Sequence, residues 1–591
     1  MMRYFRATAT GQQPMKAMLA KFAWREGFVP LAVLSLYFAV FAFFLARLLP
    51  EYERTVTSVF ISRAGRISLA AAAASLIIFL VLRKLAGETG FIPRGERKKF
   101  AAADLLLLLL PLTPVVQYLI KNRDIFSPAD ATLVLAGFAL FSLALIIFIP
   151  ALLGKIGSAG TLAILGMAFA FIITDMASLS ARYRWFETGN LRIQLPIFGG
   201  VFLVARLLYR GPNGRKLLYL LLSGYFLANT LTHLAAPESN RVGPESGAGE
   251  NPLVKLTGSR TPLSRPNIYF LVYDSYVVNE TMLAYGIDNH GQQEYLEEKG
   301  FKTYPHAYSV GEYTIPSISR TMEVSADYYG SRRRGISGSG TVHRLLKQFG
   351  YRTYGICQSN RFFQGIGSGY DYSFPEIDTR ASAKLLAKAI LMGEFRFDVA
   401  FDRPTRERFV EYKTGIFDQE SPEPRFVYMH DYLPGHSQIS GECLPNETEL
   451  FRERLAEANR QMQRDVETII RNDPGAIIIV AGDHGPYLTK NCVATGNDYD
   501  ISEISRLDIQ DRFGAFLSIR WPDENFSGYD EITVLQDIFP AVFAYIFQDR
   551  QFLESRIEPR TLAPDFISDA EVIDGIIRGG IHDGEPLFLG P

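Results

Sequence analysis

Cysteine is scarce in this 591-residue sequence, which contains three: Cys357, Cys443 and Cys492. No two are spaced as Cys-x-x-Cys, so a zinc site built from thiolates is not expected. Cys443 and Cys492 each follow a candidate active-site segment, and in an oxidising compartment such a pair can form a disulfide. The sequence leaves that pairing open and predicts that Cys357 is buried and free.

An excess of charge of one sign is also absent. The 61 Lys and Arg residues balance 62 Asp and Glu residues, which gives a net charge of −1. No basic stripe is interleaved with aromatic residues in the way that favours binding to nucleic-acid phosphates and bases. We therefore expect no nucleic-acid partner.

Long apolar runs are frequent, but only in the first 236 residues. Most approach the roughly 20 residues that a helix needs to cross a bilayer, although the run at 195–209 is short and follows Pro196. One early run could be a signal peptide, whereas a series predicts an all-α membrane domain of about seven helices over residues 1–236. The runs are 28–49, 66–83, 102–120, 131–153, 160–178, 195–209 and 216–234.

Basic residues indicate how this membrane domain is oriented. They gather before the first run, in the second loop and in the sixth loop, for example at Arg25, Lys99 and Arg210. Short loops rich in Lys and Arg stay in the cytoplasm. Because the number of crossings is odd, the N-terminus is expected in the cytoplasm and the C-terminal half outside it. In a bacterial inner membrane that side is the periplasm.

The C-terminal half has the composition of a globular domain. Residues 237–265 are rich in Pro, Gly, Ser and charge, and we interpret them as a linker to a domain at 266–591. Short apolar runs then alternate with helical patterns, which predicts an α/β domain whose mostly parallel sheet is sandwiched by helices. The expected strands are 267–273, 352–357, 425–430, 476–481 and 515–519, and the expected helices are 292–299, 316–325, 340–349, 449–472 and 533–547.

The segment AGDHGPY places Asp483 and His484 directly after the apolar run 476–481. That run predicts a buried parallel strand, and open α/β sheets bind their ligands at the carboxyl ends of such strands. A carboxylate beside an imidazole suits a divalent cation. A simpler interpretation is an Asp that caps a helix, with His484 as a bystander.

Three other clusters fall at predicted strand or helix ends. Asp274 follows the strand 267–273, Thr314 precedes a helix opened by Pro316, and MHDYLPGH follows the strand 425–430. Asp274, Asp483 and His484 can hold a divalent ion that also binds the Thr314 hydroxyl and lowers its pKa, which produces a nucleophile. Each residue alone also fits a turn or a helix cap. The ordered set is what favours the metal site.

This order of motifs resembles the alkaline phosphatase superfamily in its sulfatase-like branch. A multispan membrane domain before such a domain resembles the lipid A phosphoethanolamine transferases and lipoteichoic acid synthases. The resemblance implies that Asp274 is the first carboxylate ligand, a position held by Glu in many of these transferases. It implies that Thr314, in the pattern S-x-G-x-x-T, is the nucleophile and a ligand. Asp483 and His484 match the paired ligands, and His436 matches a His that binds substrate phosphate.

The sequence departs from these families in several ways. Cysteines that brace the nucleophile loop of many phosphoethanolamine transferases are missing, and a later active-site His has no clear counterpart. Arg512 lies there instead and is a candidate contact for phosphate or headgroup, although a surface Arg fits as well. Asn360 and Arg361, in QSNRFF, are further substrate candidates.

A second metal ion is a further hypothesis, because two-metal relatives add one Asp and two His residues. Asp431, His436 and His582 could supply them, although the spacing from Asp431 to His436 is one residue longer than usual. For the first ion, mixed oxygen and imidazole ligands suit zinc and manganese equally.

The combined hypothesis is a membrane phosphotransferase. It would move a headgroup, phosphoethanolamine or phosphoglycerol, from a membrane phospholipid through a covalent phospho-threonine to a glycan or lipid acceptor of the envelope. A tethered phosphatase, phosphodiesterase or sulfatase-like hydrolase of envelope glycans is one alternative. A sulfatase proper is disfavoured, because Thr314 cannot form the formylglycine that sulfatases make from Cys or Ser. A non-catalytic envelope scaffold is another alternative.

Overall fold

The computed structural model describes the C-terminal half of the chain almost throughout and parts of the N-terminal half. The described residues are 102–121, 128–143, 212–235, 241–242, 251–363, 368–376, 404–419, 421–437, 444–489, 501–562 and 570–590, with the single residues Ala73 and Ile77. The chain forms two compact units, which divide near residue 237. Cys443 and Cys492 lie outside the described residues, whereas Cys357 is a buried free thiol, as predicted.

The described part of the N-terminal unit is helical. Helix α4 contacts both α5 and α9. These helices fall on the predicted apolar runs 102–120, 131–153 and 216–234, whereas the other runs lie outside the described residues except for Ala73 and Ile77. Among the described helices, none is at once long and apolar enough to cross a membrane. The bounds are η3 Ala102–Leu108, α4 Leu109–Lys121, α5 Pro128–Leu143 and α9 Pro212–Ala235.

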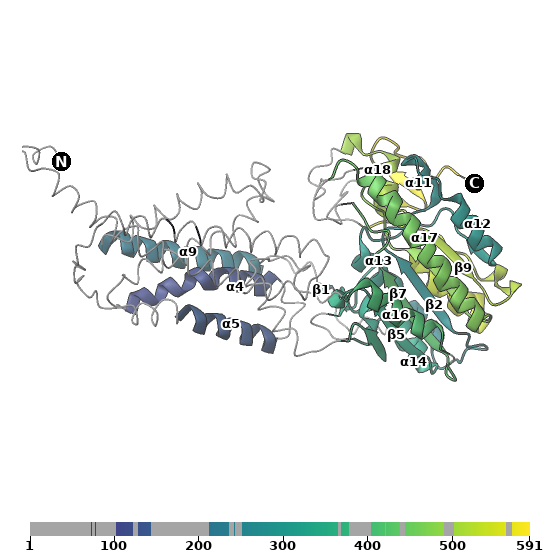
Figure 1. The fold of residues 1–591 in the computed structure, drawn as a ribbon, viewed down its shortest axis with the longest axis horizontal. Coiled ribbons are helices and arrows are strands. Elements are labelled where there is room, and N and C mark those ends of the chain that lie inside the picture. The colour runs from purple at the N-terminus through teal and green to yellow at the C-terminus, as the bar shows by residue number, and fades with distance from the viewer. Residues whose placement is uncertain are drawn as a thin grey trace, which may run out of the picture. The chain divides into compact units, whose positions relative to one another are not determined.

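A mixed, mostly parallel sheet forms the centre of the C-terminal unit (Figure 1). Its strands in the described residues follow the order β3-β9-β8-β2-β7-β5-β6. β8, β2, β7, β5 and β6 are parallel neighbours, while β9 is antiparallel to both β8 and β3. The bounds are β2 Ile268–Tyr273, β3 Phe301–Thr303, β5 Arg352–Cys357, β6 Tyr372–Phe374, β7 Arg425–Asp431, β8 Ile477–Gly482 and β9 Leu517–Arg520.

Strands β2 and β8 carry no charged residue, as expected for strands whose two faces are both covered by helices. Side chains alternate along β2: Phe270 and Val272 enter one core cluster with residues of α13, α14 and α19. Tyr269 and Leu271 enter the other cluster with residues of α12, α16 and α17. The predicted α/β sandwich is therefore confirmed for this unit, and all five predicted strands are present.

The helices of the sandwich match the predicted ones to within a few residues. The observed helices that correspond to predicted ones are α12 His290–Glu298, α13 Thr314–Glu323, α14 Thr341–Gln348, α17 Glu447–Asn472 and α19 Ile538–Phe547. Helices that the sequence patterns did not indicate are α10 Pro252–Thr257, α11 Asn279–Ala284, α16 Arg406–Phe417 and α18 Arg506–Phe513. Short 3-10 helices are η7 Asn360–Phe362, η10 Ile501–Glu503, η11 Glu524–Gly528, η12 Leu535–Asp537 and η13 Arg550–Ser555, and η6 Gly335–Ser339 is a π-helical turn.

Two small antiparallel strand pairs complete the described unit, of which β10 and β11 form a hairpin. β1 (Arg241–Val242) pairs with β4 (Gly330–Ser331), and β10 (Glu571–Ile573) pairs with β11 (Ile576–Arg578), both antiparallel. Residues of β10 and β11 join a third apolar cluster with residues that flank the nucleophile candidate, including Val310. The C-terminal segment therefore supports the loop before Thr314.

A buried ion-pair network ties α16 and α17 to the sheet. Lys413 is fully buried, and its Nζ lies 2.6 Å from Asp465 Oδ2 and 3.3 Å from Asp431 Oδ2. Arg406 adds two hydrogen bonds to Asp431, of 2.6 and 3.1 Å. The Tyr273 hydroxyl donates to Asp465 at 2.8 Å. Charges buried this deeply persist only because each has a partner.

We predict that Lys413→Met lowers the free energy of unfolding by about 3–5 kcal/mol, because it leaves buried carboxylates short of a positive charge. A matched control is Lys299→Met. Lys299 is 38% exposed and lies 3.7 Å from Glu467, so its loss should cost about 1 kcal/mol or less. Urea unfolding followed by circular dichroism measures both. Equal effects of the two substitutions would contradict the role given to Lys413.

Candidate metal centre

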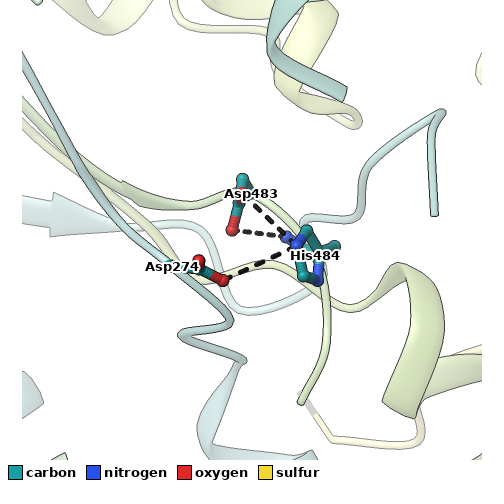
Figure 2. Close-up of side chains that lie close together, drawn as sticks. All are labelled: Asp274, Asp483 and His484. Carbon is teal, nitrogen blue, oxygen red and sulfur yellow. Dashed lines mark hydrogen bonds and ion pairs between the residues drawn. The ribbon is translucent and has the colours of Figure 1, made fainter. Parts of the chain in front are cut away.

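Neighbouring strands bring two carboxylates together at one edge of the sheet. β2 and β8 are paired so that Tyr273 lies opposite Gly482, and each strand is followed directly by an aspartate, Asp274 or Asp483. With His484 they form a group whose ligand atoms lie within 4.8 Å of one another, and Figure 2 shows the three side chains converging. Among the described residues, this is the one group of His, Cys, Asp and Glu side chains with metal-binding geometry.

The imidazole of His484 presents Nε2 to this centre. Nδ1 lies 2.8 Å from the Gly485 carbonyl oxygen, so Nδ1 carries the proton and donates it. Nε2 then has its lone pair free for a cation. It lies 3.4 Å from Asp483 Oδ2 and 3.6 Å from Asp274 Oδ1.

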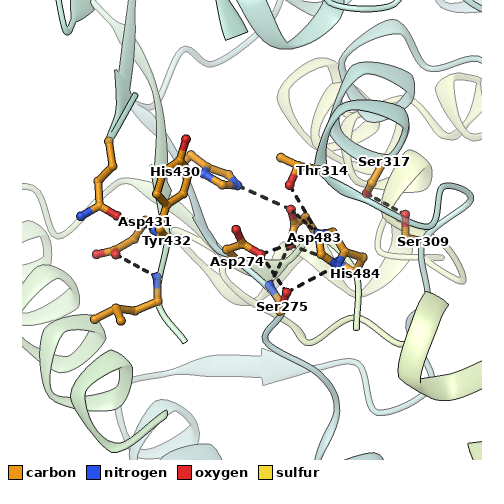
Figure 3. Close-up of polar contacts among 12 residues, drawn as sticks. Asp274, Ser275, Ser309, Thr314, Ser317, His430, Asp431, Tyr432, Asp483 and His484 are labelled. Atoms are coloured by element: carbon orange, nitrogen blue, oxygen red, sulfur yellow. Dashed lines mark hydrogen bonds and ion pairs between the residues drawn. The ribbon is translucent and has the colours of Figure 1, made fainter. Parts of the chain in front are cut away.

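The Thr314 hydroxyl faces the same point. Thr314 is the first residue of α13, and its Oγ1 lies 3.4 Å from His484 Nε2. Figure 3 shows it on the side of the cluster toward α13. The loop before α13 is held by a 2.6 Å hydrogen bond between Ser309 and Ser317, and Gly311 packs directly on the backbone of α13. All four residues predicted to form the metal site are thus brought together.

Ser275 was not recognised in the sequence, yet it contacts both carboxylates. Its amide donates to Asp483 Oδ1 at 2.9 Å, and its hydroxyl donates to Asp274 Oδ1 at 2.8 Å. The backbone of Ser275 has φ 63°, a left-handed conformation that costs free energy in residues other than Gly. Strained residues cluster at functional sites. The residue type and position of Ser275 in the sequence, however, do not predict its left-handed backbone or its contacts with the two carboxylates.

The charge of Asp483 is stabilised by its neighbours. Burial alone would raise the pKa of the carboxyl, but the imidazoles of His484 and His430 outweigh it and hold the pKa well below its usual range. His430 is fully buried at the end of β7, and its Nε2 lies 3.5 Å from Asp483 Oδ2. The carboxylate therefore stays ionised across the whole physiological range, as a metal ligand must.

An aromatic stack supports His484 from behind. The ring of Tyr487 lies parallel to His484, with ring centroids 5.1 Å apart, and the Arg512 guanidinium lies 4.1 Å from the centroid of Tyr487. The Tyr487 hydroxyl donates to the Glu312 carbonyl, two residues before Thr314. Arg512 is only 2% exposed. Its guanidinium packs on the Tyr487 ring, and a phosphate or headgroup contact for Arg512 stays a prediction.

Glycine is required on both sides of the Asp483-His484 pair. A Cβ on Gly482 would lie 1.8 Å from the Tyr276 carbonyl oxygen, and one on Gly485 would lie 2.0 Å from the Asp511 carbonyl oxygen. The two ligands are thus carried on a segment that packs backbone against backbone. This packing limits how far the ligands can move.

The candidate substrate residues His436, Asn360 and Arg361 come from two segments, the loop after β7 and η7. The His436 ring lies 6.4 Å from that of His484, and its Nδ1 donates to the Ser437 carbonyl at 2.6 Å. Asn360 lies on η7, whose Phe362 packs edge-on against His430 at 5.2 Å. Arg361 also lies on η7, but its side chain is outside the described residues. Substrate contacts for these three residues stay predictions.

The second metal site is not assembled. Asp431, His436 and His582 do not form a metal-binding group within the described residues. Burial would raise the pKa of Asp431, but Lys413 and Arg406 hold it below its usual range, so this carboxylate is already neutralised by protein cations. Figure 3 shows it apart from Asp274 and Asp483. His582 pairs instead with Glu585, so the prediction of a second ion was wrong for this set.

The chemistry of the donor set fits one divalent ion. Two carboxylates, an oriented imidazole nitrogen and a hydroxyl provide mixed oxygen and nitrogen ligation of the kind that zinc and manganese accept. The Asp274 side chain keeps 13% exposure while that of His484 keeps 2%, so a substrate would reach the centre from the side of Asp274 and Thr314. Each ligand also has a supporting contact within the protein.

Comparison with other proteins gave structural similarities alone. No protein-family model matches the chain, and no curated protein matches it in sequence. Its structural neighbours include phosphoethanolamine transferases and members of the sulfatase and alkaline phosphatase superfamily, all at low identity. At the TM-scores given below, these similarities carry no inference about the function of the chain.

Three of these solved structures are given with their sequence identity, coverage and TM-score. The C-terminal periplasmic domain of EptC from Escherichia coli, in complex with Zn, is 13% identical, with 48% of this chain and 83% of that chain covered and a TM-score of 0.32. Lipooligosaccharide phosphoethanolamine transferase A (EptA) from Neisseria meningitidis is 14% identical over 88% of this chain and 96% of that chain, with a TM-score of 0.33. The putative sulfatase yidJ from Bacteroides fragilis is 12% identical over 53% and 87%, with a TM-score of 0.31.

We predict that the purified full chain binds about one zinc or manganese ion per molecule at this centre. Asp483→Asn removes an ionised ligand and should weaken binding by about 100-fold or more. Asp288→Asn is the control, because Asp288 is an exposed carboxylate paired with His290. Metal content after chelation, reloading and desalting measures the effect. Undiminished binding by the Asp483 variant would refute the site.

Tyr487 offers a second prediction, because its ring and its hydroxyl contact different parts of the site. Tyr487→Leu removes the stack on His484 and should lower metal affinity about 10-fold. Tyr487→Phe keeps the ring and removes only the hydrogen bond to Glu312, so metal affinity should stay near that of the unmodified chain. Competition with a chelating dye measures both affinities. Equal losses in the two variants would show that the stack does not support His484.

Proposed function

We propose that this protein is a metal-dependent phosphotransferase that uses Thr314 as its nucleophile. The observation that carries the proposal is the convergence of the Thr314 hydroxyl with Asp274, Asp483 and His484, with Thr314 Oγ1 3.4 Å from the unprotonated nitrogen of His484. Each of these groups taken alone also fits an ordinary structural role, such as a turn or a helix cap. Their convergence on a single point at a partly exposed edge of the sheet supports catalysis.

The residues of the centre supply activation and charge stabilisation. A divalent ion held by Asp274, Asp483 and His484 would lower the pKa of the Thr314 hydroxyl and polarise the phosphoryl group. Thr314 also begins α13, and first-turn N–H groups and the helix dipole favour an anion at that end. The negative charge of the reacting phosphoryl group is therefore placed where the protein favours it.

In the first half-reaction, Thr314 Oγ1 attacks the phosphorus atom of a membrane phospholipid. The new bond joins Oγ1 to phosphorus, and the bond from phosphorus to the diacylglycerol oxygen breaks. The Thr314 hydroxyl gives up its proton as it attacks, and diacylglycerol leaves after its oxygen takes up a proton from water. The phosphorylated headgroup, phosphoethanolamine or phosphoglycerol, remains on Thr314 as a covalent ester.

In the second half-reaction, a hydroxyl or phosphate oxygen of an envelope glycan or lipid attacks the same phosphorus atom. The bond to Thr314 breaks, and the hydroxyl regains its proton. His436 is proposed to contact the substrate: its Nδ1 donates to the Ser437 carbonyl, so the lone pair of Nε2 is left to accept the proton of the attacking hydroxyl. The residues Asn360 and Arg361 are proposed to contact the headgroup.

Membrane attachment agrees with this chemistry. The donor lipid never leaves the bilayer, so an enzyme anchored in the same bilayer meets it at high effective concentration. We propose that residues 1–236 anchor the protein with its N-terminus in the cytoplasm, that residues 237–265 link the domains, and that residues 266–591 act in the periplasm. Zinc and manganese are the proposed ions.

Thr314 substitutions test the proposal. With phosphatidylethanolamine or phosphatidylglycerol in mixed micelles, mass spectrometry should find the headgroup phosphate on the Thr314 peptide of the full chain. Thr314→Ala should abolish the adduct and slow diacylglycerol release by about 10³-fold or more, because the attacking oxygen is gone. Thr314→Ser keeps a hydroxyl and should retain the adduct.

The mass on Thr314 distinguishes the competing functions. Phosphoethanolamine or phosphoglycerol supports transfer, while bare phosphate or rapid release to water supports a hydrolase. A Thr314→Ala variant that releases diacylglycerol as fast as the unmodified chain refutes the nucleophile. No adduct and no release in a metal-loaded chain would favour the scaffold.

A further inference from the structure

A group of basic side chains lies beside Thr314 and has no role in the proposed reaction. Three consecutive arginines, Arg332 to Arg334, follow β4. Arg332 Nη1 donates to the Tyr313 hydroxyl at 3.4 Å, and Tyr313 directly precedes Thr314. Tyr313, Thr314 and Arg332 are all partly exposed. A substrate at Thr314 can therefore reach Arg332.

Arg320 packs on the same aromatic ring as Arg332, that of Tyr328. Its guanidinium carbon lies 4.5 Å from the centroid of the Tyr328 ring, and that of Arg332 lies 5.7 Å from the same centroid. Arg320 is 8% exposed, and its Nε donates to the Ala326 carbonyl at 2.7 Å. Two guanidinium groups on one aromatic ring repel each other, and an anion beside them would relieve that repulsion.

Both arginines keep buried donors without an acceptor in the described part of the chain. These are Arg320 Nη1 and Arg332 Nε. A buried charged donor without an acceptor is costly, so a ligand that supplies an acceptor is favoured. Burial also lowers the pKa of Arg320, with Arg332 as a further cause, and the nearby Glu312 and Tyr328 act in the opposite direction. The neighbour Arg334 differs, because it pairs with Glu323 and the Tyr329 carbonyl.

We propose that Arg332, with Arg320 behind it, binds a second anionic group of the substrate, a phosphate or carboxylate separate from the phosphoryl group that reacts at Thr314. Arg320 follows Thr314 by six residues on α13, a rise of roughly 9 Å along the helix axis. An ethanolamine ammonium would be repelled here. The subsite therefore recognises another part of the donor lipid or the acceptor, and this proposal rests on the proposed function.

A binding experiment tests the subsite without requiring turnover. The probes are hexyl phosphate and hexane-1,6-diyl bisphosphate, titrated calorimetrically into the metal-loaded full chain. The bisphosphate should bind about 10-fold or more tightly than the monophosphate, because a charge-assisted hydrogen bond is added. Arg332→Gln should remove this preference and leave monophosphate binding unchanged. Arg334→Gln, the matched control, should keep it.

Two further variants keep the result interpretable. Arg332→Lys retains the charge but loses the planar fork, so it should fold and show a reduced preference. A preference that is absent in the unmodified chain, or that survives both Arg332 substitutions, overturns the proposal. These outcomes do not depend on the Thr314 adduct, so the subsite and the phosphotransferase can fail separately.

Kinetics identify which substrate carries the second anion. If it belongs to the donor, Arg332→Gln should slow adduct formation from cardiolipin, a lipid with two phosphates, about 10-fold more than from phosphatidylglycerol. If it belongs to the acceptor, the variant should slow transfer to glycerol 3-phosphate and spare transfer to glycerol. Equal slowing with every substrate contradicts the proposal.

Discussion

The site depends on holding two carboxylates, Asp274 and Asp483, close together at the ends of neighbouring parallel strands. Two like charges at this distance repel each other, and the protein offsets that repulsion with directed hydrogen bonds. The Ser275 amide and hydroxyl bind one carboxylate each, and the imidazoles of His484 and His430 favour the ionised form of Asp483. The pairing of β2 with β8 sets the separation, so the register of the sheet determines the geometry of the site.

A third carboxylate at a strand end, that of Asp431, forms ion pairs within the protein and is not part of the candidate metal centre. Asp431 ends β7, directly beside β2, and the Asp274 amide donates to its backbone oxygen. Its side chain, however, is paired with Arg406 and buried Lys413. Adjacent strand ends thus carry an aspartate neutralised by fixed cations and an aspartate directed to the candidate metal centre. The resemblance to two-metal relatives puts Asp431 in a second metal site, but its side chain pairs with Arg406 and Lys413 instead.

Local patterns in the sequence were enough to predict the five main strands, the layered fold and the convergence of four site residues. Apolar runs mark strands buried on both faces, and the topology of parallel strands then brings their carboxyl ends together. What could not be predicted depends on contacts distant in sequence. Ser275 adopts a strained backbone, Arg512 is buried over Tyr487, and Asp431 meets Lys413 on a helix that showed no clear pattern. None of these contacts has a local sequence signal.

The packing around the centre also constrains how the chemistry can proceed. Gly482 and Gly485 fit backbone against backbone, and Tyr487 links His484 to the loop that carries Thr314. A displacement of the ligand segment would therefore displace the nucleophile loop as well. Such coupling favours a site that is preorganised before a substrate binds, as the proposed chemistry would require. If the proposed transfer is correct, the partly exposed face with Thr314 and Arg332 is where specificity for donor and acceptor has to be determined.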